Sequence, residues 1–192
     1  MSRSLRFRSA ALVVAISALL AGCTAPPAAA PETSLPATLT VADLEVLAPV
    51  DVVDALEALP PAARPTDYTV SVRPAALLVT AADGERELPL PDDVFYLSVA
   101  PYVDSTHECF FHSLTTCLGE LADEELTVTV VADDGEVLVD ETRRTSANGF
   151  LGLWLPRDVR GTLTVASEGR TASTAFGTGD DDPTCLTTLQ LT

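Results

Sequence analysis

The chain contains no lysine, and its 192 residues include only two histidines, His107 and His112. Its 11 basic residues face 28 acidic ones, which gives a formal net charge of −17. Such a surface repels nucleic acid and anionic lipid head groups, so we exclude nucleic acid as a partner. The sequence also lacks the GxSxG and GxGxxG patterns and a phosphate-binding loop. These absences argue against a conventional hydrolase, and a binding protein is favoured over an enzyme.

Residues 1–22 are typical of an export signal and not of a folded segment. They begin with three arginines, continue with a short apolar run over residues 10–20, and end with Leu20-Ala21-Gly22 before Cys23. The run is too short for a transmembrane helix. This ending is similar to the lipobox of bacterial lipoproteins, which implies that Cys23 carries lipid and anchors the protein outside the cytoplasmic membrane. An ordinary cleaved signal peptide is the alternative.

The segment 23–38 consists mainly of Ala, Pro, Thr and Ser, a composition that favours a semi-extended tether. If Cys23 is lipidated, three thiols remain, and three cysteines cannot all pair within one chain. An odd cysteine in an exported protein indicates an intermolecular bond or a working thiol.

The rest of the chain predicts an α+β fold that is mostly β. Residues 51–59 have helical spacing, with Asp51 as the expected cap and Pro60-Pro61 as the end. We divide the remainder near residue 93 into a small N-terminal α/β subdomain, 39–93, and a β-sandwich-like metal-binding domain, 94–192. Strands are expected at 68–72, 76–80, 85–90, 95–101, 126–132, 136–140, 150–155, 161–166, 170–176 and 185–191.

Potential metal ligands are concentrated between residues 106 and 120. This stretch contains His107, Cys109, His112 and Cys117, and the other thiol of the folded region is Cys185. Thiolates with few imidazoles favour Cu(I), although Zn(II) and iron–sulfur chemistry use the same ligand types. The spacing is not the CxxC pair of zinc ribbons. A structural disulfide between two of the three cysteines remains an alternative.

Threonines flank two of these cysteines. Thr115 and Thr116 precede Cys117, and Thr184 precedes Cys185. Their hydroxyls could donate hydrogen bonds to the sulfur atoms. They could equally be ordinary strand residues.

Several blocks of the sequence, taken in order, resemble the CueP family of periplasmic copper-binding proteins. These blocks are RPTDYTVSVRP (64–74), FYLSVAPYV (95–103), THECFFHSLTTCLGEL (106–121), NGFLGLWLPRD (148–158), GTLTV (161–165) and PTCLTTLQL (183–191). The resemblance places the functional cysteines of that family on Cys109, Cys117 and Cys185, and its histidines on His107 and His112. A lipid anchor would be a departure from the family.

The resemblance implies a two-domain protein, often a homodimer through the N-terminal part, that binds copper in the cell envelope. It also implies a role in copper resistance and delivery of copper to a Cu/Zn superoxide dismutase. Two other functions stay open: a thiol pair that reduces Cu(II) to Cu(I), and a structural lipoprotein with one disulfide and a spare thiol. The reduction potential of the thiol–disulfide pair distinguishes these functions, and it cannot be read from a sequence.

Overall fold

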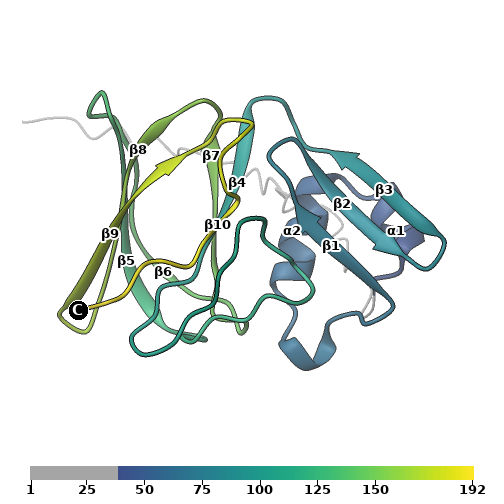
Figure 1. Ribbon diagram of the computed structural model, residues 1–192, viewed down its shortest axis with the longest axis horizontal. Coiled ribbons are helices and arrows are strands. Elements are labelled where there is room, and N and C mark those ends of the chain that lie inside the picture. Colours follow the sequence, from purple (N-terminus) through teal and green to yellow (C-terminus); the bar gives the residue numbers. More distant parts are fainter. Residues whose placement is uncertain (1–38) are drawn as a thin grey trace, which may run out of the picture. The chain divides into compact units, whose positions relative to one another are not determined.

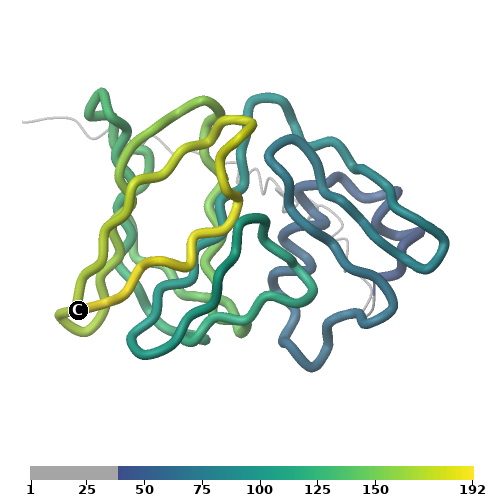
Figure 2. Tube along the Cα trace, viewed as in Figure 1, coloured from purple at the N-terminus to yellow at the C-terminus, as the bar shows by residue number. Residues whose placement is uncertain are grey.

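The computed structural model describes residues 39–192 (Figures 1 and 2). The predicted signal segment, the lipid site Cys23 and the tether 23–38 lie outside the described residues. Among residues 39–192, no helix is long and apolar enough to cross a membrane.

Two short helices open the described chain. Helix α1, Val41–Val46, was not predicted; it begins with a capping box in which Thr40 and Asp43 bond reciprocally. Helix α2, Pro49–Glu57, begins and ends two residues earlier than expected. Its N-cap is Ala48, so the prediction that Asp51 caps the helix was wrong. Proline fits this first turn because its missing N–H has no intrahelical partner there. A 3₁₀ turn, η1, follows at Pro61–Ala63.

The first sheet is antiparallel, with the order β1-β2-β3. Its strands are β1 Tyr68–Val72, β2 Ala76–Ala81 and β3 Gly84–Pro89. Leu44 of α1 and Val52, Val53 and Leu56 of α2 are buried in the same apolar cluster as residues of β1 and β2. The helices therefore cover one face of this sheet (Figure 1).

Two further sheets build the rest of the fold. One has the order β10-β4-β7, from β4 Val94–Val99, β7 Leu151–Pro156 and β10 Cys185–Leu186. The other is antiparallel in the order β6-β5-β8-β9, from β5 Glu125–Ala132, β6 Val137–Arg144, β8 Arg160–Ser167 and β9 Arg170–Gly177. Their facing residues form the largest apolar cluster, so the two sheets make a sandwich.

Strand β4 is covered on both faces. Phe95, Leu97 and Val99 point into the sandwich core, whereas Tyr96 joins the cluster of the helices and the first sheet. The mostly β, α+β fold class is thus confirmed. The division into 39–93 and 94–192, and dimerisation through the first part, stay predictions.

The strand pattern was largely predicted, with one clear error near the C-terminus. Residues 185–191 were expected to form one strand, but β10 contains only Cys185 and Leu186, which pair in parallel with Ser98 and Val99. Beyond them, pairing with the segment after β4 resumes only as an isolated parallel bridge between Tyr102 and Gln190, so no continuous strand forms. The short strand still places Cys185 at the centre of the fold.

Candidate metal centre

The Cys/His stretch, residues 106–120, runs along the outer edge of β1. The N–H of Val72 donates to the carbonyl of His112 at 2.7 Å, and the N–H of Leu114 donates to Val70 at 2.9 Å. Ser71 and Ser113 form the antiparallel bridge between these bonds. The edge of the first sheet is therefore covered, and the loop gains a fixed register against it.

The C-terminal end of the stretch is fixed at Gly119 and Glu120. The carboxylate of Glu120 accepts N–H bonds from Val103, Asp104 and Ser105, and these bonds lower its pKa. The N–H of Gly119 donates to Asn148 at 2.6 Å, and a Cβ on Gly119 would lie 2.5 Å from the carbonyl oxygen of Gly149. Only glycine permits this close approach of two backbones.

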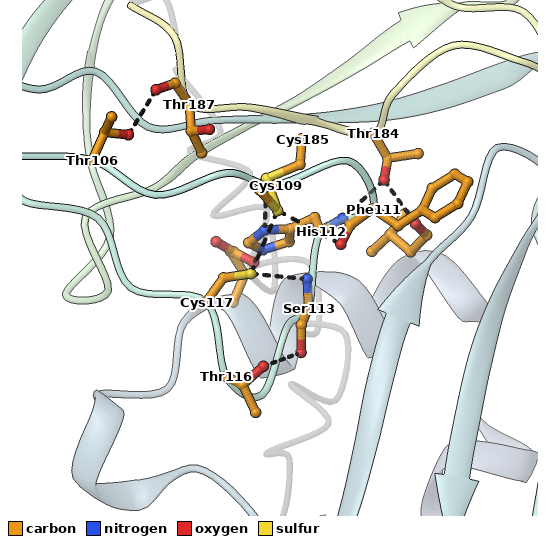
Figure 3. The surroundings of a disulfide bond; sticks show 12 residues. Thr106, Cys109, Phe111, His112, Ser113, Thr116, Cys117, Thr184, Cys185 and Thr187 are labelled. Atoms are coloured by element: carbon orange, nitrogen blue, oxygen red, sulfur yellow. Dashed lines mark hydrogen bonds and ion pairs between the residues drawn. A yellow bond between two sulfur atoms is a disulfide. The ribbon is translucent and has the colours of Figure 1, made fainter. Parts of the chain in front are cut away.

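All three cysteines of the described chain meet at one place (Figure 3). Cys109 and Cys185 form a disulfide, with their Cα atoms 5.7 Å apart. The thiol of Cys117 is free and lies 3.7 Å from the sulfur of Cys109. The N–H of Ser113 donates to Cys117 Sγ at 3.3 Å. The cysteines predicted as ligands do converge, and of the pairings left open the structure contains Cys109–Cys185.

The two histidines of the Cys/His stretch differ in their exposure to solvent. His107 is exposed, and its ligating nitrogen, Cys109 Sγ and Cys117 Sγ all lie within 4.8 Å of one another. His112 is fully buried, with Nδ1 4.0 Å from Cys185 Sγ and its ring centroid 4.6 Å from that of Phe150. The imidazole of His107 is therefore open to solvent, whereas that of His112 is enclosed by the protein.

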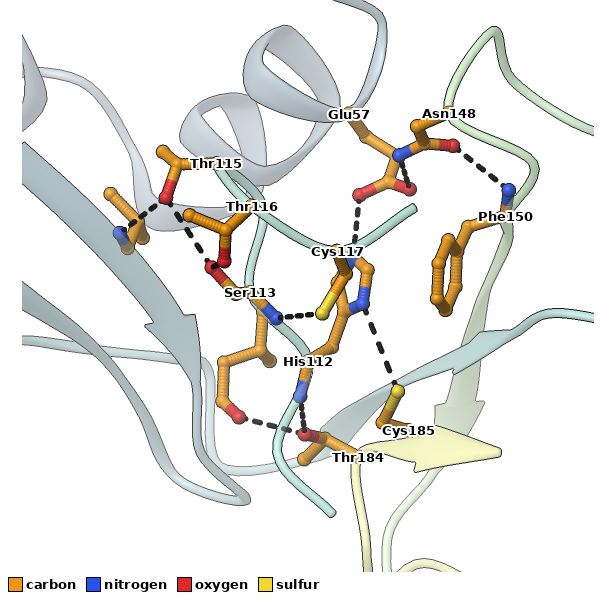
Figure 4. A network of polar contacts seen from close by, with 12 residues as sticks. Glu57, His112, Ser113, Thr115, Thr116, Cys117, Asn148, Phe150, Thr184 and Cys185 are labelled. Atoms are coloured by element: carbon orange, nitrogen blue, oxygen red, sulfur yellow. Dashed lines mark hydrogen bonds and ion pairs between the residues drawn. The ribbon is translucent and has the colours of Figure 1, made fainter. Parts of the chain in front are cut away.

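Three further polar residues, Glu57, Asn148 and Arg64, surround the buried histidine and Cys117. Figure 4 shows Glu57 and Asn148 beside His112. Glu57, the last residue of α2, lies 3.0 Å from His112 Nε2 through one carboxylate oxygen. Asn148 Nδ2 donates to the other oxygen at 2.8 Å. Arg64 donates to the carbonyl of Cys117 at 2.7 Å. The sequence places Glu57 only within the expected helix, because contacts across 55 and 91 residues leave no local signal.

The titratable groups of this cluster, Cys117, His112 and Glu57, favour the charged forms of one another. Burial alone would raise the pKa of Cys117, but His112, the Ser113 N–H and Arg64 outweigh it and lower that pKa. Burial would lower the pKa of His112, yet its contacts with Cys117 and Glu57 raise it. The pKa of Glu57 is lowered in spite of burial, chiefly by the hydrogen bond from His112. The buried groups therefore stabilise one another as partners.

The flanking threonines hold the backbone and do not bond to sulfur. Thr184 Oγ1 accepts the N–H of His112 and donates to the carbonyl of Val72. Thr115 accepts the N–H of Val70, and Thr116 donates to Ser113. The donor to a cysteine sulfur is instead the backbone N–H of Ser113, so the hydroxyl hypothesis is not supported.

Three cysteine sulfurs and two imidazoles at one place define a soft to borderline donor set on a β-rich scaffold. In the oxidised form only Cys117 can supply a thiolate, because the other two sulfurs share a bond. Reduction of the disulfide would supply three. Donors of this kind bind Cu(I) and Zn(II) and are unsuited to Mg²⁺ or Ca²⁺. The molecule is thus of the thiol-rich metal-binding class.

The model of the periplasmic copper-binding protein CueP family matches residues 51–190. The crystal structure of S.CueP is similar to this fold with a TM-score of 0.71 and 43% sequence identity, covering 74% of this chain and 88% of that one. No curated protein matches the chain. The chain belongs to the CueP family. It is therefore a copper-binding protein that is located outside the cytoplasmic membrane.

Proposed function

We propose that this protein holds Cu(I) between the thiolates of Cys109, Cys117 and Cys185 and thereby contributes to copper resistance in the cell envelope. The convergence of the three sulfurs carries the proposal, because two come from the Cys/His stretch and the third comes from β10. Three thiolates enclose a soft monovalent ion in a low-coordinate site. Cys185, His112 and Phe150 are almost fully buried, so this side of the site keeps water from the bound ion.

A second function is reduction of Cu(II), and the Cys109–Cys185 disulfide favours it. Two thiolates can each transfer one electron to a Cu(II) ion, which yields one disulfide and two Cu(I) ions. The product of that reaction would be a disulfide, and the Cys109–Cys185 bond shows that two cysteines of the site lie close enough to form one. A thiol or dithiol reductant must then return two electrons to the disulfide before the next cycle. In this scheme the exposed His107 captures Cu(II), since imidazole is a harder donor than thiolate.

Delivery of copper to a Cu/Zn superoxide dismutase and homodimerisation through residues 39–93 are part of the proposal. Two side chains of the Cys/His stretch, Phe110 and Leu118, are apolar and exposed, which supports docking of a protein that receives copper. Exposed apolar side chains beside a metal site are suited to transient protein contact.

Thiol counting with and without copper separates binding, reduction and a purely structural disulfide. In the reduced Cys23→Ser protein, we expect three thiols to react with a thiol reagent after unfolding. Cu(II) should leave one reactive thiol and release two Cu(I) ions to a Cu(I)-specific dye. Cu(I) should protect all three thiols in the folded protein until a chelator removes it. Thiol counts that copper leaves unchanged, both in the reduced protein and in the oxidised protein with its single thiol, would support the structural lipoprotein instead.

The proposal places the protein on the membrane through lipid at Cys23. We expect Cys23→Ser to move the protein from the membrane fraction to the soluble fraction and to abolish incorporation of labelled fatty acid. Thr24→Ser is a matched control that leaves the cysteine in place. A Cys23→Ser protein that stays in the membrane fraction with its lipid would refute anchoring at this residue.

A further inference from the structure

We propose that Glu57 is a positioning residue of the copper site, which fixes the orientation and the tautomer of His112. The inference rests on the proposed copper chemistry and names a group that the donor set does not include. Glu57 Oε2 lies 3.0 Å from His112 Nε2. A carboxylate can only accept, so Nε2 keeps a proton, and whenever the ring is neutral the lone pair therefore lies on Nδ1. That atom faces Cys185 at 4.0 Å.

The carboxylate is itself held in place. Asn148 Nδ2 donates to its second oxygen at 2.8 Å, and Asn148 Oδ1 accepts the N–H of Phe150 at 2.8 Å. Phe150 packs against the imidazole. The Glu57 side chain therefore cannot rotate without breaking bonds on both oxygens, and the ring is fixed by a bond at one edge and by an aromatic contact.

The position of Glu57 lowers the stability of helix α2. It is the last residue of α2, where the helix dipole disfavours an anion, and it is only 6% exposed. A carboxylate at this point does not stabilise α2. Its bonds go instead to the Cys/His stretch and to the turn before β7, so its structural effect is to join these two segments at His112.

Metal-binding histidines commonly bond through their second nitrogen to a carboxylate, and loss of that partner typically costs roughly 10–100-fold in affinity or activity. We therefore expect Glu57 to affect the step that depends most on His112, the capture and reduction of Cu(II). Cu(I) retention by the thiolates should change less. This difference separates positioning from a general structural role.

The test uses Glu57→Met, which keeps the length of the side chain but removes the strong acceptor, in the full-length protein carrying Cys23→Ser. Glu57→Gln is the conservative variant, since its amide oxygen can still accept. Asp54→Asn is the control, because Asp54 lies one turn earlier on α2 and bonds only to Trp154. Each protein is assayed for the rate of Cu(II) reduction with a Cu(I)-specific dye. The tautomer of His112 is read from long-range proton–nitrogen NMR spectra at a pH where the ring is neutral.

We expect the parent and Asp54→Asn to carry the proton of His112 on Nε2. Glu57→Met should populate both tautomers and reduce Cu(II) roughly 10–100-fold more slowly, and Glu57→Gln should recover part of the rate. The NMR signals of His107 in the same spectra serve as the internal reference for those of His112. A neutral His112 protonated on Nδ1 in the parent would overturn the inference without any variant. So would a folded Glu57→Met protein with unchanged tautomer and rate. A parent that neither binds nor reduces copper would overturn the proposed function, while the NMR result would still decide the role of Glu57.

Discussion

Replacement of any one of Cys109, Cys117 or Cys185 by serine is expected to lower the Cu(I) affinity of the reduced protein at least about 100-fold. Loss of an outer partner of a ligand already costs 10–100-fold, and loss of the ligand itself should exceed that. Two remaining thiolates still hold Cu(I) in a near-linear arrangement, so binding should weaken without global unfolding. The measurement is a Cu(I) titration against a competing chelator.

Cys23→Ser is the matched control for these variants, because it makes the same chemical change outside the described site. Replacement of His107 or His112 should instead disturb Cu(II) capture and reduction more than Cu(I) retention. Adding Zn(II) to the same titration tests selectivity, and the reduced parent should keep Cu(I) at comparable zinc concentrations. If Cys185→Ser binds Cu(I) as tightly as the parent, β10 does not contribute to the site. Displacement by zinc would make this a zinc-binding site.

The strands were the most predictable part of the fold, because a half-buried strand alternates apolar and polar residues. Leu126, Val128 and Val130 show this alternation and are all buried in β5. Helix α1 was overlooked although its T-x-x-D capping box is visible at Thr40 and Asp43. Its six residues are too few to show a helical period.

The candidate ligands were found from residue types alone, but the chemistry that connects them was not. The sequence permitted any pairing among three cysteines, and only the spatial order around Cys109 distinguishes the bonded Cys185 from the free Cys117. Glu57 could not be separated from an ordinary solvent-facing helix residue by periodicity. Its role depends on a contact between the end of a helix and a loop that follows much later in the chain.

Reduction of the Cys109–Cys185 disulfide is expected to lower the free energy of unfolding by about 4 kcal/mol. The two residues are 76 positions apart, and a loop of that size restricts the unfolded chain strongly in the chain-entropy model. Domains are typically stable by about 5–15 kcal/mol, so the reduced protein should remain folded but be clearly weakened. Denaturant unfolding of the Cys23→Ser protein, oxidised and then reduced without oxygen, measures the difference.

Cu(I) should restore much of this loss, because an ion that binds only the folded protein stabilises it by mass action. The gain is about 2.7 kcal/mol when free Cu(I) is about 100 times its dissociation constant. Cys117→Ser is the informative control, since it keeps the disulfide but lacks one thiolate after reduction. It should lose the same stability on reduction and, at the same free Cu(I), recover less. A reduced parent that Cu(I) does not stabilise would mean that the three sulfurs, although adjacent, do not form one copper site.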